Sequence, residues 1–459
     1  MKRELKFKIS LFVLAFILPL FLALYSYQQN GMGFFDSSLQ GRLGDENGYG
    51  TIAKNIAEHG VFSASLVSPF VPDPIRTPIF PYFFALGYWL TGNFILSILL
   101  NILVGALTVV VVFEIAFIIL GGVWPAFISA LIFAVLPYRI FLSTGILADT
   151  LFLFLFSIFV LFFLKILKSP DGPKWWLVAG SGALLGLATL TRPIVQFFIV
   201  IPAFCCLFLN SLEIKKRVGM IVVMTFSFLL ILSPWLYRNY VNFDKAFISS
   251  LGDYHMFVSY IVPWRAFQQH ITDSEASQII QKELAHKYGQ DVIHNEVATA
   301  ELGQQAKREI LADPLSYIAF HLSTIPIYFL NNDVLLTLRE AFNVNLPNIN
   351  MAQKILLGDL GGLFDLVYSS QIFFVLLFIV SYLLLALKTG LGIAGVFMYF
   401  RRSIPMALFS LASIFYFPLI IGPEGNARFR LPVEIFLVIF SVFAIIEIRN
   451  FIKNKKVRS

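Results

Sequence analysis

The chain of 459 residues is too apolar for a water-soluble globular protein. Hydrophobic residues make up 58% of it and charged residues 13%, whereas soluble domains carry roughly 25% charged residues. This composition indicates a polytopic membrane protein. The net charge of +7 does not indicate a nucleic-acid partner, because the basic residues cluster between apolar segments, where they set topology. The two cysteines, Cys205 and Cys206, are adjacent in an apolar run and provide neither a disulfide framework nor a metal site.

The chain begins with a basic segment and an apolar run over about 9–25, which we interpret as an uncleaved membrane anchor. The basic flank places the N-terminus in the cytoplasm, so the first loop, 27–93, lies outside. Part of this loop, from Gly44 to Gly60, has apolar residues at the spacing of one helical face: Tyr49, Ile52, Ala53, Ile56 and Ala57. The pattern predicts a short helix in the membrane–water interface with its apolar side down.

An acidic pair, Asp45-Glu46, stands at the start of this predicted helix. Asp45 could be only an N-cap, because a carboxylate there accepts hydrogen bonds from backbone N–H groups that have no helical partner. It could also be a functional carboxylate, because partial burial at the membrane surface changes the pKa of an acid. These residues alone leave both interpretations open.

Further along the same loop, Arg76 and Tyr82 flank the start of an apolar run, Ile79–Leu90. A dozen or so residues are too few to cross about 30 Å of hydrocarbon. We therefore predict a partly embedded helix that does not span the membrane.

Longer apolar segments follow, and basic residues gather in alternate loops between them, notably Lys165–Lys174 and Lys215–Arg217. Basic loops are cytoplasmic, so Asp45 and Asp149 are expected to face the same outer compartment. With the first anchor, the chain is predicted to cross a plasma or inner membrane about ten times, with both termini in the cytoplasm. The nine later predicted spans are 94–118, 123–142, 148–167, 175–190, 193–209, 218–236, 371–388, 404–421 and 431–447.

A polar insertion separates two groups of spans. Thr272–Glu275 forms a capping box that begins one helix, which Gly289 ends, and a second helix is expected at 295–311. The apolar segment 317–330 is expected to be re-entrant or interfacial, because a crossing there would break the charge alternation downstream.

Three regions follow from this pattern: a transmembrane catalytic module at 1–240, an extracytoplasmic helical insertion at 241–369, and C-terminal transmembrane helices with a basic cytoplasmic tail at 370–459. Lys388 and Arg401-Arg402 are expected at cytoplasmic ends of the last group of spans.

No familiar soluble-enzyme motif is present: there is no phosphate-binding glycine loop, His-Glu-x-x-His, nucleophile elbow or Cys/His cluster. Asp149 is predicted near the outer start of a span, where it could again be an N-cap. Arginines on the outer side are not expected from the positive-inside rule, so the presence of each one there has to be explained. Each could extend to lipid headgroups. As a group, they fit a phosphate-bearing lipid, because guanidinium binds phosphate with two parallel hydrogen bonds. The six arginines are Arg76, Arg139, Arg192, Arg238, Arg428 and Arg430.

The chain resembles the GT-C membrane glycosyltransferases of family 39, which include protein O-mannosyltransferases and lipid A aminoarabinose transferases. The ordered motifs that carry this resemblance are Gly44-Asp45-Glu46-x-x-Tyr49, Arg76-Thr77-Pro78-x-x-Pro81-Tyr82, Leu147-Ala148-Asp149-Thr150, Thr191-Arg192-Pro193, Pro234-Trp235-x-x-Arg238-Asn239-Tyr240 and Arg428-Phe429-Arg430-Leu431-Pro432.

The resemblance implies a GT-C fold and transfer of a sugar from a polyprenyl-phosphate donor to an extracytoplasmic glycan, lipid or protein. Asp45 would be the general base of an inverting displacement, with Glu46 sharing or tuning that role. Asp149 would orient the acceptor or help to hold a divalent metal, for which the histidine candidates are His255 and His321. No other cofactor is implied. The expected substrate-binding residues are Tyr49, Tyr82, Asn239 and the six arginines.

Two other classes of function compete with an enzyme. A transporter or flippase of a lipid-linked sugar would need charged residues within its spans, and internal repeats. Apart from Glu114 the predicted spans are nearly free of charge, and no repeat is visible. A non-catalytic scaffold would leave the polar residues of the outer loops without a role.

Overall fold

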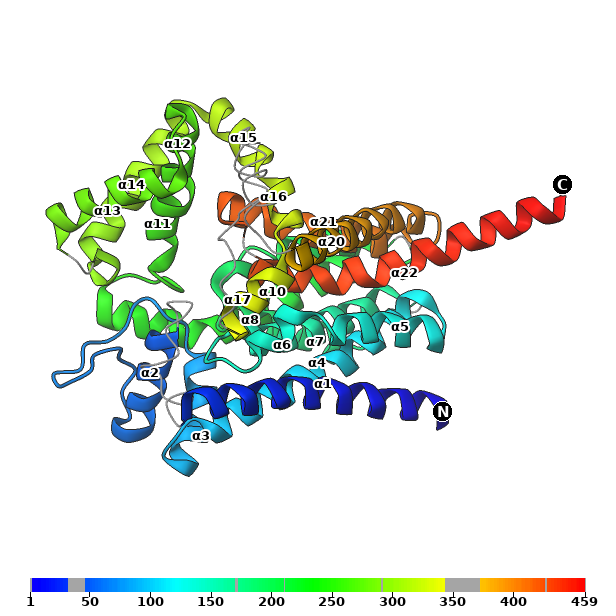
Figure 1. Ribbon diagram of the computed structural model, residues 1–459, viewed down its shortest axis with the longest axis horizontal. Coiled ribbons are helices and arrows are strands. Elements are labelled where there is room, and N and C mark those ends of the chain that lie inside the picture. Colours follow the sequence, from blue (N-terminus) through cyan, green and yellow to red (C-terminus); the bar gives the residue numbers. More distant parts are fainter. Residues whose placement is uncertain are drawn as a thin grey trace.

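The structure, a computed structural model, describes residues 2–31, 46–169, 172–209, 211–289, 292–342, 372–425 and 427–458. These residues form helices and connecting loops, and no strand occurs among them. Most of the helices run alongside one another in a bundle, and a smaller group stands beyond one end of it (Figure 1). The prediction of an all-α polytopic membrane protein is confirmed.

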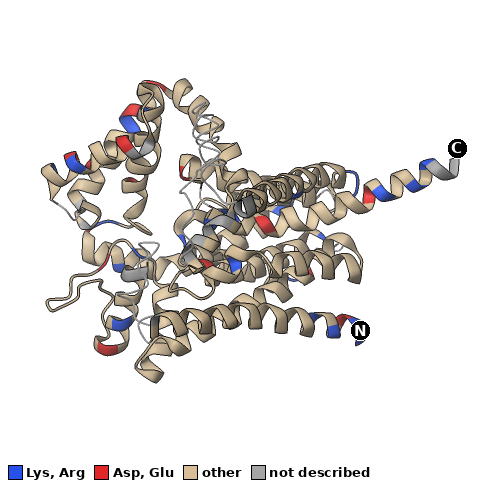
Figure 2. Cartoon of the chain, in the orientation of Figure 1, with Lys and Arg blue, Asp and Glu red and all other residues tan. Residues whose placement is uncertain are grey.

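Within the described residues, seven helices are long and apolar enough to cross a membrane. Such helices satisfy their own backbone hydrogen bonds, as hydrocarbon requires. The N-terminus and the C-terminus lie at the same end of the bundle (Figure 1). Figure 2 shows Lys and Arg residues gathered near both of these ends. We call the opposite end the distal end. The seven helices are α1 (Lys2–Asn30), α4 (Ile95–Leu120), α7 (Asp149–Leu167), α10 (Ile214–Phe243), α20 (Ile372–Tyr399), α21 (Ile404–Ile421) and α22 (Ala427–Arg458).

Three of the predicted crossings consist of shorter helices. The predicted spans 123–142, 175–190 and 193–209 contain, respectively, α5 (Val123–Ala134) with α6 (Pro137–Leu142), α8 (Trp175–Thr189), and α9 (Val200–Leu207). Pro137 begins α6, and the residue before a proline avoids the helical conformation. The helix is therefore interrupted at Leu136. The predicted total of about ten crossings counts these three segments together with the seven long helices.

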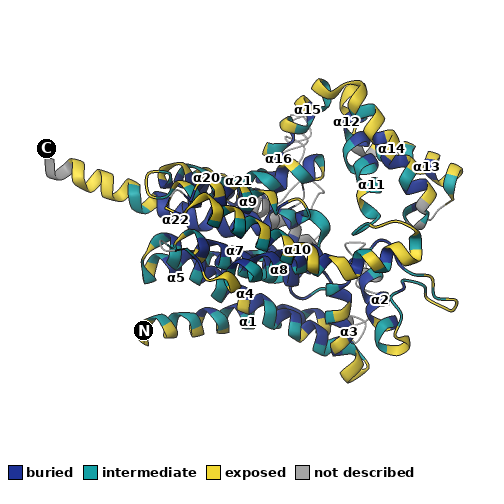
Figure 3. Ribbon diagram, turned by 180° about the vertical axis from the view of Figure 1, so that it is seen from behind, coloured by how far each residue is buried: buried dark blue, intermediate teal, exposed yellow. Residues whose placement is uncertain are grey.

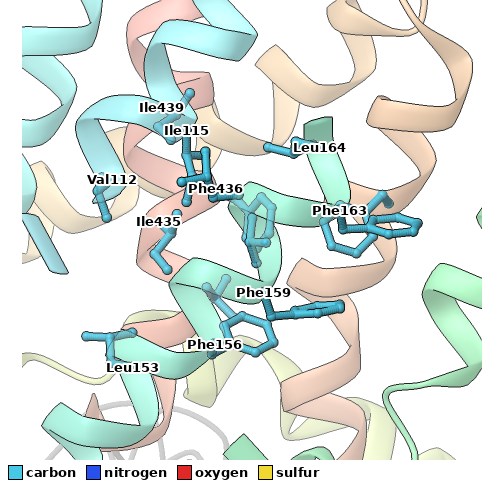
Figure 4. Close-up of a cluster of buried hydrophobic side chains, with 14 of the residues drawn as sticks. Val112, Ile115, Leu153, Phe156, Phe159, Phe163, Leu164, Ile435, Phe436 and Ile439 are labelled. Atoms are coloured by element: carbon cyan, nitrogen blue, oxygen red, sulfur yellow. The ribbon is translucent and has the colours of Figure 1, made fainter. Parts of the chain in front are cut away.

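The centre of the bundle is built around α7, whose aromatic residues recur at helical spacing. Phe156, Phe159 and Phe163 are fully buried, and Figure 4 shows them among aliphatic side chains of α4 and α22. The rings of Phe156 and Phe159 are 5.8 Å apart. Each large buried ring contributes several kcal/mol, since truncating one to alanine typically costs about 3–5 kcal/mol. This packing fixes the position of α7 and therefore of Asp149, its first residue.

The first loop contains the two predicted helices, α2 (Glu46–His59) and α3 (Ile79–Thr91). On α2, Ile52 and Ala53 are completely buried, whereas Lys54 is exposed. The apolar side of α2 packs against α3, and the rings of Tyr49 and Phe80 are 5.0 Å apart. The helix is present as predicted, but protein rather than lipid covers its central apolar residues, because α3 supplies an apolar surface.

A small unit stands beyond the distal end of the bundle (Figure 1). It has a hydrophobic core of its own, which includes Phe257, Trp264 and Leu302. The predicted capping box is present: Thr272 Oγ1 accepts a hydrogen bond from the backbone N–H of Glu275, and Glu275 accepts one from that of Thr272. We call this the distal unit; it comprises α11 (Leu251–His255), a π-helical turn (Met256–Ile261), α12 (Val262–Gln269), α13 (Asp273–Tyr288) and α14 (Glu296–Ala312).

Two short helices connect the distal unit to the bundle, namely α15 (Pro314–Ser323) and α16 (Ile325–Leu330). The chain bends by 101° between α14 and this pair. Asp313 marks the bend, because its carboxylate accepts a hydrogen bond from the backbone N–H of Ser316 and so caps α15. After α17 (Asp333–Phe342), the remainder of the predicted insertion, 343–369, lies outside the described residues.

Lys388 was predicted at the end of a span, but it lies in the middle of one. Helix α20 continues to Tyr399, so Arg401 and Arg402 follow its end and Lys388 lies deep within it. Its Nζ is 2.6 Å from Oε2 of Glu434, a buried residue of α22. An ammonium group within a span is tolerated when a carboxylate neutralises it. Sequence reasoning missed this partner, and with it the charge inside the last span.

Candidate functional site

Asp149 brings together three segments that are far apart in the sequence. Its side chain is 4% exposed. Its Oδ1 accepts a hydrogen bond from Arg192, and its Oδ2 accepts one of 2.7 Å from Nε of Arg428. Charge-assisted hydrogen bonds of this kind are about twice as strong as neutral ones. The carboxylate therefore holds two guanidinium groups in fixed positions, and we call these three residues the Asp149 clamp.

Local structure explains why Asp149 is available for this role. The turn before α7 is held on α4 by Asn101, whose side-chain amide donates to the backbone carbonyls of Ser143 and Gly145 at 3.2 and 3.3 Å. Ala148 occupies the N-cap position, and no side chain caps the helix there. Asp149 is thus the first helical residue, and its carboxylate is directed to the arginines rather than to the backbone of its own helix.

Arg192 approaches the clamp from the end of α8, where the chain leaves the helix in an extended conformation. Its guanidinium also lies 5.0 Å from the ring centre of Phe429, a cation–π contact that adds about 0.5–2 kcal/mol. A cavity of about 10 Å³ beside the clamp is large enough for about one water molecule. Because Phe429 directly follows Arg428, one turn of α22 supplies one partner of Asp149 and contacts the other.

Arg430 lies two residues beyond Arg428 but in a different environment. It is only 1% exposed, and its Nε donates to Oε1 of Glu434 at 2.8 Å. Its Nη1 also donates to the carbonyls of Tyr328, Phe329 and Asn331. These groups end α16, where carbonyls have no helical partner and a cation is favourable. Arg430 therefore fastens α16 to α22 and does not join the Asp149 clamp.

Arg238 lies beside a much larger cavity, which has a volume of about 660 Å³. Its guanidinium contacts the faces of Phe62, Trp235 and Phe243 at 4.7–5.3 Å. It also donates to the carbonyl of Asp73 at 2.9 Å. Tyr82, another predicted substrate-binding residue, is exposed and lines the same cavity.

Asn239 follows Arg238 but is fully buried. Its Oδ1 accepts a hydrogen bond of 2.7 Å from Arg238, and its Nδ2 donates to the carbonyl of Phe247 at 2.7 Å. Asn239 therefore orients the guanidinium from behind and does not line the cavity.

Arg76 lies against the first turns of α2. Its guanidinium carbon is 4.9 Å from the ring centre of Tyr49, and a methyl group added to Gly48 would come within 3.1 Å of its Nε. Asp45, the predicted base, and the side chain of Glu46 lie outside the described residues. Of the predicted site residues that the structure describes, Arg76 and Tyr49 lie next to the start of this helix.

Arg139 is buried and bonded to backbone. Its Nε and Nη2 donate to the carbonyl of Ala134 at 3.2 and 2.6 Å, and its Nη1 donates to that of Gly105 at 3.4 Å. Ala134 ends α5, so Arg139 satisfies a carbonyl at the break between α5 and α6. This arrangement supports the local fold: the hydrogen bonds of the guanidinium go to backbone carbonyls and not to Asp149.

No group of three metal-ligating side chains occurs among the described residues. His255 lies 3.8 Å from Glu424 and forms a hydrogen bond of 2.8 Å with Ser259. His321 bonds to the carbonyl of Leu419 at 3.0 Å and to the hydroxyl of Tyr317 at 3.2 Å. Each histidine thus has protein partners that fix its ring.

Sequence reasoning missed Asp73, which bonds to the backbone of Arg76 and to the side chain of Arg238. Its Oδ1 accepts hydrogen bonds from the backbone N–H groups of Ile75 and Arg76 at 2.9 and 2.7 Å, and its carbonyl accepts from Arg238. An aspartate that bonds to N–H groups two and three residues later forms a characteristic turn. The dipeptide Asp73-Pro74 was a signal for such a turn in the sequence.

Comparison with known proteins shows a family match over part of the chain and a similar fold. Residues 74–237 match the model of a family described as dolichyl-phosphate-mannose-protein mannosyltransferase. This segment contains Arg76, Asp149 and Arg192. No curated protein sequence matches the chain.

Among solved structures, the chain is similar to the archaeal oligosaccharyltransferase AglB from Archaeoglobus fulgidus, solved with an inhibitory peptide and a dolichol-phosphate. The TM-score is 0.51 at 16% identity, and the match covers 98% of this chain and 51% of AglB. The chain thus spans about half the length of that protein. ArnT from Cupriavidus metallidurans, bound to undecaprenyl phosphate, matches with a TM-score of 0.33 at 14% identity, over 94% of this chain and 77% of ArnT. The family match and the AglB-like fold confirm the predicted resemblance to GT-C glycosyltransferases.

Proposed function

We propose that this chain, which has the family match and the fold of a GT-C membrane glycosyltransferase, transfers a sugar from a polyprenyl-phosphate donor to an acceptor outside the cytoplasm. The observation that carries the proposal is the Asp149 clamp. Two guanidinium groups and one carboxylate give it one surplus positive charge, which would favour the approach of an anionic donor. The clamp joins three of the sequence motifs that resemble this family.

The donor is assigned to the cavity of about 660 Å³ beside Arg238. A polyprenyl phosphate has an apolar chain and a charged head, and this cavity combines an apolar wall of residues such as Phe62 and Trp235 with one guanidinium group. Arg238 would bind the phosphate of the donor, while the aromatic side chains contact the adjoining part of the lipid. Arg430 is excluded from this role because it is buried against Glu434.

The reaction would be a single displacement. The acceptor oxygen attacks the anomeric carbon of the sugar, and the bond from that carbon to the phosphate oxygen breaks with inversion. The lipid phosphate leaves with the electron pair, and Asp45 takes the proton of the acceptor hydroxyl. Arginines that face the phosphate stabilise the charge that grows on it in the transition state. Asp149 would act as a positioning residue that keeps Arg192 and Arg428 in place.

Arg76 supports a role for the start of α2, because it lies over Gly48 and Tyr49, which follow Asp45-Glu46 in the sequence. Its guanidinium puts a positive charge beside the first turns of this helix. The outer placement of this region follows from the alternation of basic loops between the spans.

Mass spectrometry of lipid-linked sugars and surface glycans, with the wild-type protein, with Asp45→Asn, and without the protein, tests the function. We expect one glycan to lose a sugar, and the matching lipid-linked sugar to accumulate, both without the protein and with Asp45→Asn. Identical glycans in all three samples would overturn the proposal.

A flippase would be indicated instead if the lipid-linked sugar stayed on the cytoplasmic side and Asp45→Asn behaved as wild type. The charges within the spans do not favour it, because Lys388 and Arg430 are both paired with the same buried carboxylate, Glu434.

A further inference from the structure

Helix α15 is apolar on the side that no described residue covers. Residues 314–330, which contain α15 and α16, include no Asp, Glu, Lys or Arg. On α15, Leu315, Ile318 and Leu322 are 81%, 50% and 49% exposed. Their spacing of three and four residues places them on one face of the helix. Figure 3 shows exposed residues along α15, between the distal unit and the bundle.

The opposite side of α15 belongs to the distal unit. Phe320 is buried in the core of that unit, and its ring lies 5.3 Å from that of Phe267. Tyr317 packs beside it, with its ring 5.5 Å from that of Trp264. The orientation of α15 is therefore fixed by the distal unit, and the exposed apolar face is a consequence of this packing rather than of a loosely attached helix.

The polar groups of α15 are satisfied within the protein. Ser323 Oγ donates to the carbonyl of Phe320 at 2.6 Å, and Thr324 Oγ1 donates to that of His321 at 2.6 Å. His321 itself bonds to Leu419 and Tyr317. A segment that touches hydrocarbon has to satisfy its polar groups internally, because lipid tails offer no partners.

The position of α15 indicates what covers its apolar face. The helix has 10 residues, which is too short to cross a bilayer. Only Thr324 separates it from α16, which packs against α20 and is fastened to α22 by Arg430. Helix α20 exposes apolar residues such as Leu383 and Leu384 along the surface of the bundle, as a helix in contact with lipid does. Through α16, helix α15 therefore leads from this lipid-facing surface to the distal unit.

We propose that Leu315, Ile318 and Leu322 form a lipid-binding face, with which α15 lies on the surface of the bilayer and anchors the distal unit to it. The partner is the lipid bilayer itself, bound through apolar contact and not through charged headgroups, since this segment carries no Lys or Arg. The anchor would hold α11–α14 over the distal end of the bundle.

Single cysteines at 315, 318 and 322, labelled with the environment-sensitive fluorophore NBD in liposomes, test this contact. Both native cysteines are buried and would be replaced by alanine. The matched control is Val297→Cys on α14, where the native side chain is 69% exposed. We expect the three α15 labels to emit at shorter wavelength than the control and to be quenched roughly threefold more by doxyl-labelled lipids.

Two results of the labelling experiment would overturn the proposal. Labels on α15 that are quenched by aqueous iodide as strongly as the label at 297 would place the face in water. Labels shielded from both iodide and doxyl lipids would show that another part of the chain covers it. A second measurement uses the unlabelled double variant Leu315→Glu/Leu322→Glu, for which we expect faster proteolysis of the distal unit in liposomes than for Val297→Glu. Equal proteolysis of the two would contradict anchoring. Neither experiment depends on transferase activity.

Discussion

Arg428 donates a hydrogen bond of 2.7 Å to Asp149 although 279 residues separate them. One partner begins the central helix of the bundle and the other lies in the first turn of its last helix. The bond therefore ties the start of the central helix to the start of the last one. Its strength depends on the second arginine, because Arg192 binds the other oxygen of the same carboxylate.

Asp149→Asn should damage both activity and stability. The substitution keeps the shape of the side chain but leaves two guanidinium groups without a neutralising carboxylate. Breaking a buried ion pair in this way typically costs about 3–5 kcal/mol. Thermal unfolding in detergent and a transfer assay measure the two effects. The control is Arg402→Lys in the more exposed pair Arg402–Glu447 near the other end of α22, which should behave as wild type. A stable, fully active Asp149→Asn protein would remove the clamp from the mechanism.

Arg238→Lys should impair donor binding nearly as strongly as Arg238→Ala. Lysine retains the charge but cannot reproduce a planar guanidinium that binds phosphate with two hydrogen bonds and lies against aromatic rings. We expect KM for the lipid-linked donor to rise about tenfold or more, equivalent to about 1.4 kcal/mol of lost binding. Arg430→Lys is the comparison. Because Arg430 is buried, this substitution should lower the unfolding temperature and leave KM unchanged. An unchanged KM in Arg238→Lys would mean that the donor phosphate binds elsewhere.

The protein should fold without the charges of Lys388, Glu434 and Arg430, provided that all three are removed together. Glu434→Gln leaves two cations in an apolar region and should lower stability by about 3–5 kcal/mol. Replacing all three residues with methionine removes the charges together, and buried ion networks replaced by apolar side chains are often neutral or more stable. Thermal unfolding of the two variants should therefore give opposite results. If both unfolded at the same reduced temperature, the network would be required for more than charge balance.

Asp45→Asn distinguishes a general base from a helix cap. Asparagine caps a helix as well as aspartate does, so stability should hardly change. It cannot accept the acceptor's proton, and loss of a general base typically reduces the rate by roughly a hundredfold or more. Glu46→Gln should impair the rate less. A normally active Asp45→Asn protein would return Asp45 to the role of a cap.

The capping box of α13 should give the distal unit a local dependence on pH. Hydrogen bonds from the backbone and side chain of Thr272 lower the pKa of Glu275. A lowered folded-state pKa means that the contribution is present above the pKa of the unfolded chain and is lost as pH falls through the folded-state value. We expect faster hydrogen exchange in the first turn of α13 at acidic pH, after correction for intrinsic rates. In Glu275→Gln this acid-dependent change should be absent; if it persisted, another group would be responsible.

The sequence by itself determined the membrane class, the long spans, the helix α2 and the ends of α13. These features depend on residues close together in the chain, because hydrophobic periodicity and capping act over one or a few helical turns. It also indicated a set of arginines at the outer ends of spans.

Only the tertiary structure decided which of these arginines act together. Arg428 and Arg430 are two residues apart on one helix, yet one bonds to Asp149 and the other to Glu434. Successive residues of a helix point in different directions, so their partners depend on the helices that pack around them. In the same way, charge alternation predicted Lys388 at the end of a span, whereas the carboxylate that α22 supplies holds it within one. Composition sets how many charges a membrane protein carries, but the packing of distant helices sets which of them meet.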